Sequence, residues 1–462
     1  TSSDQGTTWT RKGAYAPVLS SLLWKGTDIY ASSPTNQYKA PSGVLKSTDN
    51  GTTFAPLQPK GLTDNVPVAM EIFGRNLFAV VNKGLYVSSD KGQTTTAVAS
   101  VDAPVNGLVK SPDGSLIAFG DAMFKTTDGV TWTKMANPGN VQIRFLATGD
   151  GLTFYGFTGS GVVSSTDLTT WTPVSLSVLQ FPYEFYSMSV SANGVLYFVA
   201  RIGTSTPSVY QYAAGSVNKL SFTRYARNTI TANGKIYIFD SDNSGSIIYS
   251  STNGLTWTPK PGPAGDKLII SSLNYFFIRD FHSGILYLSR DQGTTWQNVS
   301  YGDPNSDLLT PSFSAIALDE FSGLAFGGID GLPIMKSAGI VIPTDTTVPV
   351  ITGLKPVNTA TGVLPTATLS ITFDQATTTV AGKKLKIVDA ANGASFVESL
   401  DASAGVPFDR TFTFTPAATT LKYSPFTGPK QVYYITIESG AFVDLFGNPN
   451  GPVLDNTTWK FE

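Results

Sequence analysis

The sequence of 462 residues contains no cysteine. Disulfides, thiolate metal sites and cysteine nucleophiles are therefore excluded. Histidine occurs only once, at position 282, so a zinc site built from several histidines is excluded as well. A chain without cysteine is compatible with any compartment, so this absence gives no information about redox environment.

Charge and long apolar runs are also scarce. Only 14% of the residues are charged and the formal net charge is −2, so we expect no nucleic acid partner. No run approaches the roughly 18 apolar residues that a membrane-spanning helix needs, and we expect no such segment in this chain. Because the chain does not begin with Met, we expect a processed or trimmed N-terminus.

The abundant residues indicate an all-β protein. Hydrophobic residues make up 41% of the chain and aromatic residues 12%, which is enough for large cores. The length predicts about two or three domains. The 44 Gly and 28 Pro, together with many Ser and Thr, suit an exported β protein better than a cytosolic helical enzyme.

One short phrase, Ser-x-Asp-x-Gly-x-Thr-Trp, recurs through the first 300 residues. Full-length copies occupy residues 2–9, 47–54 and 289–296, and a copy without its aromatic residue occupies 88–95. Three shorter copies read TTDGVTW (126–132), STDLTTW (165–171) and STNGLTW (251–257). Each copy after the first follows a short apolar stretch. This pattern predicts one β-hairpin repeated along the chain.

The residue types explain the phrase as a turn. An Asp side chain accepts hydrogen bonds from nearby backbone N–H groups, and Gly supplies a positive φ. The Trp begins the outgoing strand and packs inward. We therefore assign a structural role to the Asp or Asn of each copy and to its aromatic anchor: Asp4, Asp49, Asp90, Asp128, Asp167, Asn253 and Asp291, with Trp9, Phe54, Trp132, Trp171, Trp257 and Trp296.

The repeated phrase resembles the Asp-box, or BNR repeat, of sialidase-like β-propellers. In that family it lies between the third and fourth strands of a blade. The resemblance covers residues 1–341 and implies a propeller, but it is not specific for an activity. In an Asp-box propeller the box turns lie on the face opposite the usual active site, so the box Asp residues are not catalytic candidates.

The spacing of the copies gives the number of blades. Their anchor positions are 9, 54, 95, 132, 171, 257 and 296, and the gap of 86 fits two blades, one of them without a box. Third strands are expected near 45, 86, 123, 162, 209, 248, 287 and 334, which predicts eight blades, with seven as the alternative. We expect the N-terminal phrase to supply the fourth strand of the last blade and so close the ring.

The composition changes after residue 341. A short Pro/Thr linker occupies 342–348, and 349–462 carries its own alternating strands, as a β-sandwich does. This segment resembles the bacterial Ig-like domain of the S-layer protein type, and Asp444, Gly447 and Asn448 form the D-x-x-GN phrase of that family. The resemblance implies a spacer or adhesive module in an extracytoplasmic setting. We expect Trp24 and Trp459 to be core residues.

The catalytic residues that the sialidase resemblance implies are not recognisable. It would require an Arg cluster, a Tyr–Glu pair and an acid/base Asp, with the first Arg in an Arg-Ile-Pro phrase. The chain has no such phrase, and neither Arg11 nor Arg75 matches it.

Several loops are expected on the functional face of the propeller. Glu184 is one of only three Glu residues before the linker, and with Asp280 it forms the nearest approach to the carboxylate pair of a glycosidase. Arg and aromatic residues in the same loops would equally form a rim that binds sugars. These candidate binding residues are Tyr183, Phe185, Arg201, Arg224, Tyr225, Arg227, Arg279, Phe281 and His282.

A possible cation site is suggested by Asp240, Asp242 and Ser244, which have the spacing of the first half of a calcium loop. The Glu expected at the twelfth position is missing. The simpler interpretation is a polar turn between two strands, with no cofactor.

The leading functional hypothesis is an exported bacterial surface protein, secreted or anchored at the cell surface. Its propeller would bind a glycan or a surface protein without catalysis, and it would be a monomer. The first alternative is a sialidase-like or xyloglucanase-like glycoside hydrolase that uses Glu184 and Asp280. The second is a structural component of a surface layer.

Overall fold

The computed structural model describes residues 21–25, 28–33, 43–47, 55–56, 67–90, 94–149, 153–176, 183–220, 222, 226, 228–232, 234–242, 245–265, 267–270, 275–279, 286–298, 313–329, 335–336, 346–392, 396–417, 420–421 and 431–462. Before residue 67 the description covers the backbone only. The chain forms two compact units. Unit 1 comprises Thr1–Ile72, Asn76–Leu318 and Phe326–Lys336, and unit 2 comprises Phe73–Arg75, Asp319–Ala325 and Ser337–Glu462.

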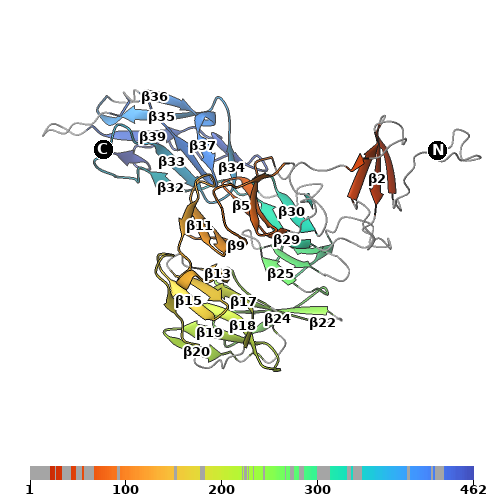
Figure 1. Ribbon diagram of the computed structural model, residues 1–462. Coiled ribbons are helices and arrows are strands. Elements are labelled where there is room, and N and C mark those ends of the chain that lie inside the picture. The colour runs from red at the N-terminus through yellow and green to blue at the C-terminus, as the bar shows by residue number, and fades with distance from the viewer. Residues whose placement is uncertain are drawn as a thin grey trace, which may run out of the picture. The chain divides into compact units, whose positions relative to one another are not determined.

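Unit 1 is a succession of small antiparallel sheets, each built from strands that follow one another in the chain (Figure 1). Seven of these sheets have four strands and the last has three. The first four sheets are β1 (Ser21–Lys25), β2 (Asp28–Ser33), β3 (Gly43–Ser47) and β4 (Ala55–Pro56); β5 (Pro67–Phe73), β6 (Asn76–Val81), β7 (Gly84–Ser88) and β8 (Thr96–Ala97); β9 (Val105–Lys110), β10 (Leu116–Gly120), β11 (Met123–Thr126) and β12 (Thr133–Met135); β13 (Ile143–Thr148), β14 (Phe154–Thr158), β15 (Gly161–Ser165) and β16 (Thr172–Pro173).

The remaining four sheets continue the same pattern. They are β17 (Tyr183–Val190), β18 (Leu196–Ile202), β19 (Ser208–Ala213) and β20 (Ser216–Lys219); β21 (Asn228–Ala232), β22 (Lys235–Asp242), β23 (Gly245–Ser251) and β24 (Thr258–Gly262); β25 (Lys267–Ile270), β26 (Phe276–Arg279), β27 (Leu286–Ser289) and β28 (Gln297–Asn298); and β29 (Phe313–Asp319), β30 (Leu324–Ile329) and β31 (Met335–Lys336). The third strands expected near 45, 86, 123, 162, 209, 248 and 287 are β3, β7, β11, β15, β19, β23 and β27, and position 334 directly precedes β31. A short 3-10 helix, η1 (Pro138–Asn140), connects two of the sheets.

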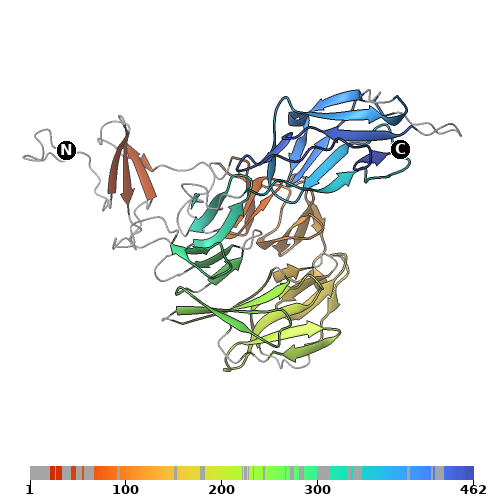
Figure 2. The same ribbon diagram turned by 180° about the vertical axis from the view of Figure 1, so that it is seen from behind.

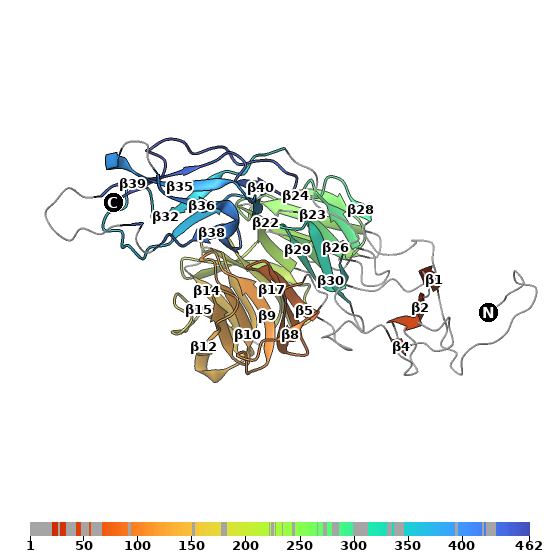
Figure 3. The ribbon, with the colours of Figure 1, turned by 90° about the horizontal axis from the view of Figure 1, so that it is seen from above.

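The first strands of successive sheets lie next to one another. β9 neighbours β13, β13 neighbours β17, β17 neighbours β21, and β21 neighbours β25; Figure 3 shows the neighbouring sheets of β5, β9 and β14 from above. Polar side chains join these strands, since Asn106 Nδ2 donates to the carbonyl of Ile143 at 3.1 Å and Asn228 Nδ2 donates to that of Leu268 at 3.2 Å. Four-stranded meanders joined in this way along their first strands form a β-propeller.

Burial differs between the strands of one sheet. All five residues of β10 and of β14 are buried, because each second strand packs against a neighbouring sheet on both faces. The outer strands β8, β12 and β16 are two or three residues long and mostly exposed. Short, polar outer strands limit pairing with other chains.

The repeated phrase forms the turn between third and fourth strands. Oδ1 of Asp128 accepts the backbone N–H groups of Val130 at 2.8 Å and Thr131 at 2.7 Å, and the hydroxyl of Thr126 donates to the same oxygen at 2.9 Å. Asp90, Asp167, Asn253 and Asp291 accept corresponding backbone N–H groups two to four residues ahead. These are the hydrogen bonds that the residue types of the phrase predict.

Leu168 occupies the position at which Gly129 and Gly254 stand in the other two short copies. All three have positive φ angles, of 60°, 74° and 72°. A non-glycine residue pays a steric cost there. Leu168 is nevertheless almost fully buried, at 1% exposure, so packing holds it in this conformation.

The aromatic anchors of the box turns pack toward the preceding sheet. The ring of Trp132 meets that of Phe78, in β6, edge to face at 5.8 Å between centroids. Trp171 lies in one core cluster with Phe119 of β10, and Trp296 in one cluster with Phe239 of β22. The anchor therefore joins its own sheet to the second strand of the sheet before it. Asp4, Asp49, Trp9 and Phe54 lie outside the described residues, as does the side chain of Trp24.

Unit 2 is mainly a sandwich of two antiparallel sheets (blue in Figures 1 and 2). One sheet has the order β32 (Ile351–Lys355), β33 (Leu369–Phe373), β38 (Thr411–Phe414), β37 (Val406–Phe408). The other has the order β36 (Phe396–Asp401), β35 (Lys384–Asp389), β39 (Tyr433–Ile437), β41 (Lys460–Phe461). A further pair is β34 (Thr377–Thr379) with β40 (Phe442–Asp444), and η2 (Ala390–Asn392) and η3 (Ala402–Ala404) are short 3-10 helices.

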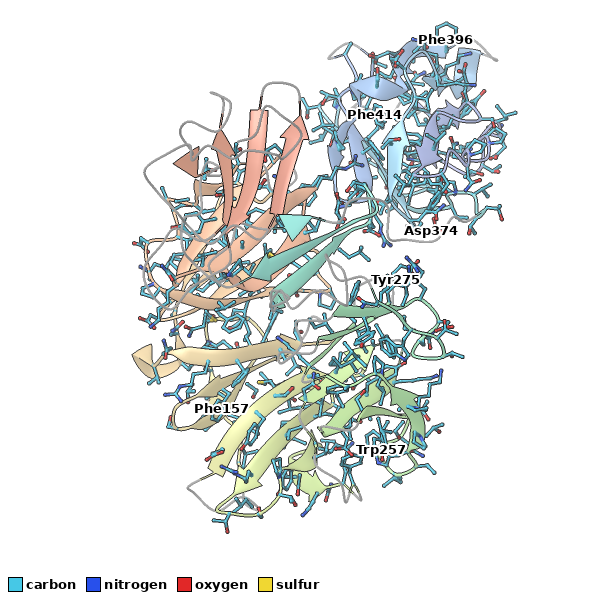
Figure 4. The ribbon with its side chains drawn as sticks, turned by 90° about the vertical axis from the view of Figure 1, so that its right-hand side faces the viewer. Phe157, Trp257, Tyr275, Asp374, Phe396 and Phe414 are labelled. Atoms are coloured by element: carbon cyan, nitrogen blue, oxygen red, sulfur yellow. The ribbon has the colours of Figure 1, made fainter. Side chains whose placement is uncertain are left out.

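Alternate residues of the sandwich strands form its core. β33 and β39 alternate strictly between buried and half-buried positions, as a sheet with one covered face requires. Phe414, labelled in Figure 4, and Trp459 are among the fully buried side chains. Trp459 also donates its indole N–H to the carbonyl of Pro356 at 2.9 Å, which confirms it as a core residue.

The D-x-x-GN phrase is a closed turn. Oδ1 of Asp444 accepts the backbone N–H groups of Phe446 and Asn448, both at 2.8 Å, and Oδ2 accepts the side-chain amide of Asn448 at 2.8 Å. Gly447 has a φ of 86°, which favours glycine. The phrase therefore fixes the chain just after β40.

Two short segments from earlier in the chain, Phe73–Arg75 and Asp319–Ala325, belong to unit 2. Arg410 donates from Nε to Oε1 of Glu320 at 3.0 Å and pairs through Nη2 with Oε2. The guanidinium of Arg75 lies 4.4 Å from the ring centroid of Phe321 and donates to the carbonyl of Thr377 at 2.9 Å. Both Arg side chains are thus held as structural groups.

Within the described part of the chain, no helix has the length and hydropathy to cross a membrane.

A turn in unit 2 repeats the hydrogen bonds of the propeller turns. Oδ1 of Asp455 accepts the backbone N–H groups of Thr457 at 2.7 Å and Thr458 at 2.6 Å, directly before Trp459. The local sequence Asp-x-Thr-Thr-Trp is the same as at 167–171. The same local chemistry therefore precedes a Trp that packs in a core cluster in both units.

Candidate functional site

The structure describes only part of the predicted site. The side chains of Glu184, Phe185, Arg201 and Asp240 are described. Tyr183, Arg279 and Asp242 are placed by their backbone alone, in β17, β26 and β22. Arg224, Tyr225, Arg227, Ser244, Asp280, Phe281 and His282 lie outside the described residues.

Glu184 and Arg201 lie opposite each other on neighbouring strands. The sequence suggested loops here, but Glu184 is the second residue of β17 and Arg201 is near the end of β18, where the two pair in register. Nη2 of Arg201 lies 2.6 Å from Oε2 of Glu184. The side chains are 34% and 59% exposed, respectively, so solvent and ligands can reach the pair. The pair stands at the end of its sheet opposite the β19–β20 turn.

Tyr186 completes this cluster and was not singled out from the sequence. Its hydroxyl donates to Oε2 of Glu184 at 2.6 Å, and the guanidinium of Arg201 lies 6.0 Å from its ring centroid. Within the described residues, Oε1 of Glu184 has no hydrogen-bond partner. Two donors therefore hold one carboxylate oxygen, while the other accepts from none of the described residues.

The same contacts set the protonation of Glu184. The hydrogen bond from Tyr186 and, next, that from Arg201 hold the pKa of the Glu184 carboxyl below its ordinary value. A carboxyl group with a lowered pKa is ionised at neutral pH and is a poor general acid. It is suited to accepting hydrogen bonds or balancing a positive charge.

Phe185 lies in the core between two sheets. Its ring stacks on that of Phe157 at 4.2 Å and on that of Phe198 at 5.2 Å. Phe157, in β14 of the preceding sheet, is labelled in Figure 4. The Phe185 ring is therefore engaged by other rings of the protein, and its backbone position fixes the neighbouring Glu184.

A β-bulge lies beside the Glu184 cluster. Phe185 pairs with Ala200 and Ser187 with Val199, so Tyr186 is an extra residue in β17. A bulge of this kind changes where the adjacent side chains point. It places Tyr186 two residues after Glu184, where its hydroxyl reaches the carboxylate.

The two preceding sheets carry the same feature at the same strand end. In β13, Arg144 is the extra residue between the paired positions Ile143 and Phe145. In β9, Asn106 is the extra residue between Val105 and Gly107. The first strands β21 and β25 pair with their neighbours without such a shift.

Arg144 was also not singled out from the sequence. Its side chain is exposed and, among the residues that the structure describes, it has no hydrogen-bond or ion-pair partner. It lies next to Phe145, whose ring centroid is 6.2 Å from that of Phe185. Arg144 and Tyr186 are therefore the extra residues of two neighbouring first strands, and Glu184 lies two residues before the second of them. We call Asn106, Arg144, Glu184, Tyr186 and Arg201 the bulge surface.

The stretch proposed as half of a calcium loop is part of a hairpin. Asp240 and Asp242 lie in β22, where they pair with Ile247 and Gly245 of β23. A calcium loop curves around its ion, whereas this backbone continues as a regular ladder. The arrangement favours the polar-turn interpretation.

Comparison with protein families identifies both parts of the chain. Residues 185–323 match the family described as DUF6242 beta propeller domain, and residues 345–462 match the bacterial Ig-like domain family. The chain therefore combines a β-propeller with a C-terminal bacterial Ig-like domain. The likeness to sialidases in particular stays a prediction. No curated protein matches the sequence.

Solved structures with a similar fold have low sequence identity. YCF48 bound to D1 peptide is 17% identical, with a TM-score of 0.46, over 62% of this chain and 98% of its own. PorZ, a bacterial surface component of the type-IX secretion system of Porphyromonas gingivalis, is 16% identical with a TM-score of 0.44, over 95% of this chain and 64% of its own. A virginiamycin B lyase from Staphylococcus aureus is 11% identical with a TM-score of 0.46, over 60% of this chain and 97% of its own. These similarities indicate neither a ligand nor an activity for this chain.

Proposed function

We propose that the protein is an extracytoplasmic binding protein of the bacterial surface, whose propeller binds a carbohydrate and whose Ig-like domain serves as a spacer. The observation that carries the proposal is the exposed cluster of Glu184, Tyr186 and Arg201. Its donors hold the carboxylate in one orientation and leave Oε1 open. Fixed polar groups beside an aromatic ring are typical of sites that bind small hydroxylated molecules.

Binding without catalysis fits this cluster better than hydrolysis. A glycosidase needs two carboxyl groups about 5–9.5 Å apart, one of them with a raised pKa. The pKa of Glu184 is instead lowered, and its charge is balanced by Arg201. A role for Glu184 as the acid of a hydrolase with Asp280 is therefore the less favoured alternative.

The surface location is supported by the Ig-like domain and by composition. Residues 345–462 match a bacterial Ig-like family. The low charge content and the absence of cysteine are compatible with export. We expect secretion or anchoring at the bacterial surface.

The proposal is tested by applying the full chain to a glycan array, with hydrolysis assays on the same sugars. We expect binding of at least one glycan, its loss in Glu184→Gln, and no turnover. Asp102→Asn is a matched control, because Asp102 is another exposed carboxylate in an ion pair, with Lys134 at 2.8 Å. Turnover that disappears in Glu184→Gln would instead establish the hydrolase. Absence of both binding and turnover would favour a structural role in a surface layer.

We further infer that the sheets of unit 1 close as an eight-bladed ring. Seven four-stranded sheets and one three-stranded sheet follow one another, which supports this number. The strand expected to join β31 comes from residues 7–14, which lie outside the described residues. Deleting residues 1–12 should then lower the melting temperature markedly, and an unchanged melting temperature would contradict closure by this segment.

A further inference from the structure

We propose that the bulge surface is one extended binding site for an acidic polysaccharide, in which Arg144 anchors a carboxylate of the sugar chain and Glu184 accepts a neighbouring hydroxyl. The inference rests on the proposed carbohydrate-binding function and names its ligand class. It adds Arg144, on the neighbouring sheet, to the Glu184 cluster.

The three bulged strands form a continuous surface. Asn106, the extra residue of β9, donates to the carbonyl of Ile143, which directly precedes Arg144 in β13. Phe145 and Phe185, which follow Arg144 and Glu184, have ring centroids 6.2 Å apart. The bulged ends of β9, β13 and β17 therefore adjoin, and a ligand longer than one sugar unit would contact more than one of them.

Three bulges at one end are not a requirement of the fold. β21 and β25 occupy the same first-strand position in their sheets and pair without an extra residue. A bulge interrupts the hydrogen-bond ladder, and bulges are enriched beside functional sites, where they redirect side chains. Here the extra residues are Asn106, Arg144 and Tyr186, so the bulges redirect an amide, a guanidinium and a phenol.

The charges of the surface favour an anionic ligand. The charge of Arg201 is balanced by Glu184 at 2.6 Å. Arg144 has no acidic partner among the described residues, and its side chain is exposed. A planar guanidinium binds a carboxylate through two parallel hydrogen bonds, so Arg144, which has no acidic partner among the described residues, is the cation of this surface that we expect to bind the ligand.

The remaining groups favour a sugar over an acidic peptide. The open Oε1 of Glu184 needs a hydrogen-bond donor, and a sugar hydroxyl supplies one beside the carboxylate that Arg144 binds. An acidic polysaccharide carries hydroxyl donors between its carboxylates, whereas the ionised side chains of an acidic peptide carry only acceptors.

The test measures binding of the full chain to three polymers by calorimetry at low salt: polygalacturonate, uncharged dextran and polyglutamate. We expect polygalacturonate to bind most tightly, with an affinity that falls as salt is added. Arg144→Gln should weaken this binding about tenfold or more, and Arg144→Lys should weaken it less. Arg290→Gln is the matched control and should have no effect, because Arg290 lies at a box turn and pairs with Gln297 at 2.7 Å.

Three results would overturn the proposal. Equal affinity for dextran and polygalacturonate would remove the role of Arg144 but leave the carbohydrate-binding function intact. Tighter binding of polyglutamate would identify an acidic protein partner instead. Unchanged affinity in an Arg144→Gln variant with an unchanged melting temperature would place the anionic site elsewhere. Failure of the proposed function itself would be recognised separately, as the absence of binding to any glycan of the array.

Discussion

Glu184 and Arg201 face each other across β17 and β18, with Oε2 of the carboxylate 2.6 Å from Nη2 of the guanidinium. The same oxygen accepts the hydroxyl of Tyr186 at the same distance. Two donors on one oxygen hold the carboxylate, and the second oxygen accepts from none of the residues that the structure describes. This asymmetry distinguishes the cluster from an ordinary surface ion pair, whose partners reorient freely.

The first prediction concerns the protonation of Glu184. The hydrogen bond from Tyr186 is the largest cause of its lowered pKa. Replacing Tyr186 by Phe removes that bond but keeps the ring, so the pKa of Glu184 should rise toward its ordinary value of 4.5. Side-chain carbon NMR of Glu184 as a function of pH measures this directly. Tyr212→Phe, in the same sheet, is the control. An unchanged pKa would show that the contact with Tyr186 does not persist in solution.

The second prediction concerns the acid stability of the propeller. Burial on its own raises the pKa of Asp128, but hydrogen bonds from the backbone of Val130 and Thr131 and from Thr126 outweigh it and lower the pKa to about 2. Since this lies below the ordinary value of 3.8, the stabilisation is present above pH 3.8 and is lost as the pH falls toward 2. Between pH 4 and pH 2, which is about the window between the ordinary and the folded pKa of Asp128, the melting temperature of Asp128→Asn should therefore fall less than that of the native chain.

The chain itself supplies the reverse experiment. Asn253 already makes the turn hydrogen bonds with an amide, at 2.9 Å and 3.0 Å to the backbone of Leu255 and Thr256. Asn253→Asp should raise the melting temperature at pH 7 and make its decline in acid steeper, because hydrogen bonds to a charged acceptor are stronger. Identical acid profiles for the native chain and both variants would contradict this account.

The third prediction separates backbone strain from packing at Leu168. Leu168 is buried, at 1% exposure, and has a φ of 60°. Leu168→Ala should cost about 2–5 kcal/mol of unfolding free energy through the lost core contacts. Leu168→Gly should cost roughly 1 kcal/mol less than Leu168→Ala, because glycine adopts this φ without steric strain. Urea unfolding of the native chain and the two variants gives the order of their unfolding free energies. An Ala variant more stable than the Gly variant would exclude strain at this position.

The fourth prediction concerns the turn of unit 2. The hydroxyls and backbone of Thr457 and Thr458 hold the pKa of Asp455 well below its ordinary value. Asp455→Ala removes these acceptors next to Trp459, so hydrogen exchange at the amides of Thr457 and Thr458 should accelerate strongly. Asp455→Asn should retain most of the protection, since Asn253 shows that a side-chain amide can accept the same backbone hydrogen bonds. Equal protection in the Ala and Asn variants would show that the side chain does not hold the turn.

Local features of the fold were readable from the sequence. The box turn is built within eight residues, so its Asp and Gly reveal its geometry without knowledge of distant contacts. Glu184 was singled out because Glu is rare before the linker, and its role in a site stays a prediction. Asp455 was missed because Val453 stands two positions before it, where every recognised copy has a Ser or Thr.

The rest depends on information that the sequence pattern does not contain. A bulge shifts the alternation of inward and outward residues by one position, so the exposure of Arg144 and the reach of Tyr186 could not be read from strand periodicity. The pairing of Glu320 with Arg410 joins residues 90 positions apart, and no local signal indicates it.

The most direct test of the central claim is calorimetric titration of the full chain and of Glu184→Gln with the best ligand from the glycan array. The account predicts measurable binding by the native chain and at least about tenfold weaker binding by the variant, because the variant loses the charged acceptor and its pairing with Arg201. The melting temperatures of the two proteins should be nearly the same, since Glu184 is exposed. Equal affinities would contradict the account and move the binding site away from Glu184.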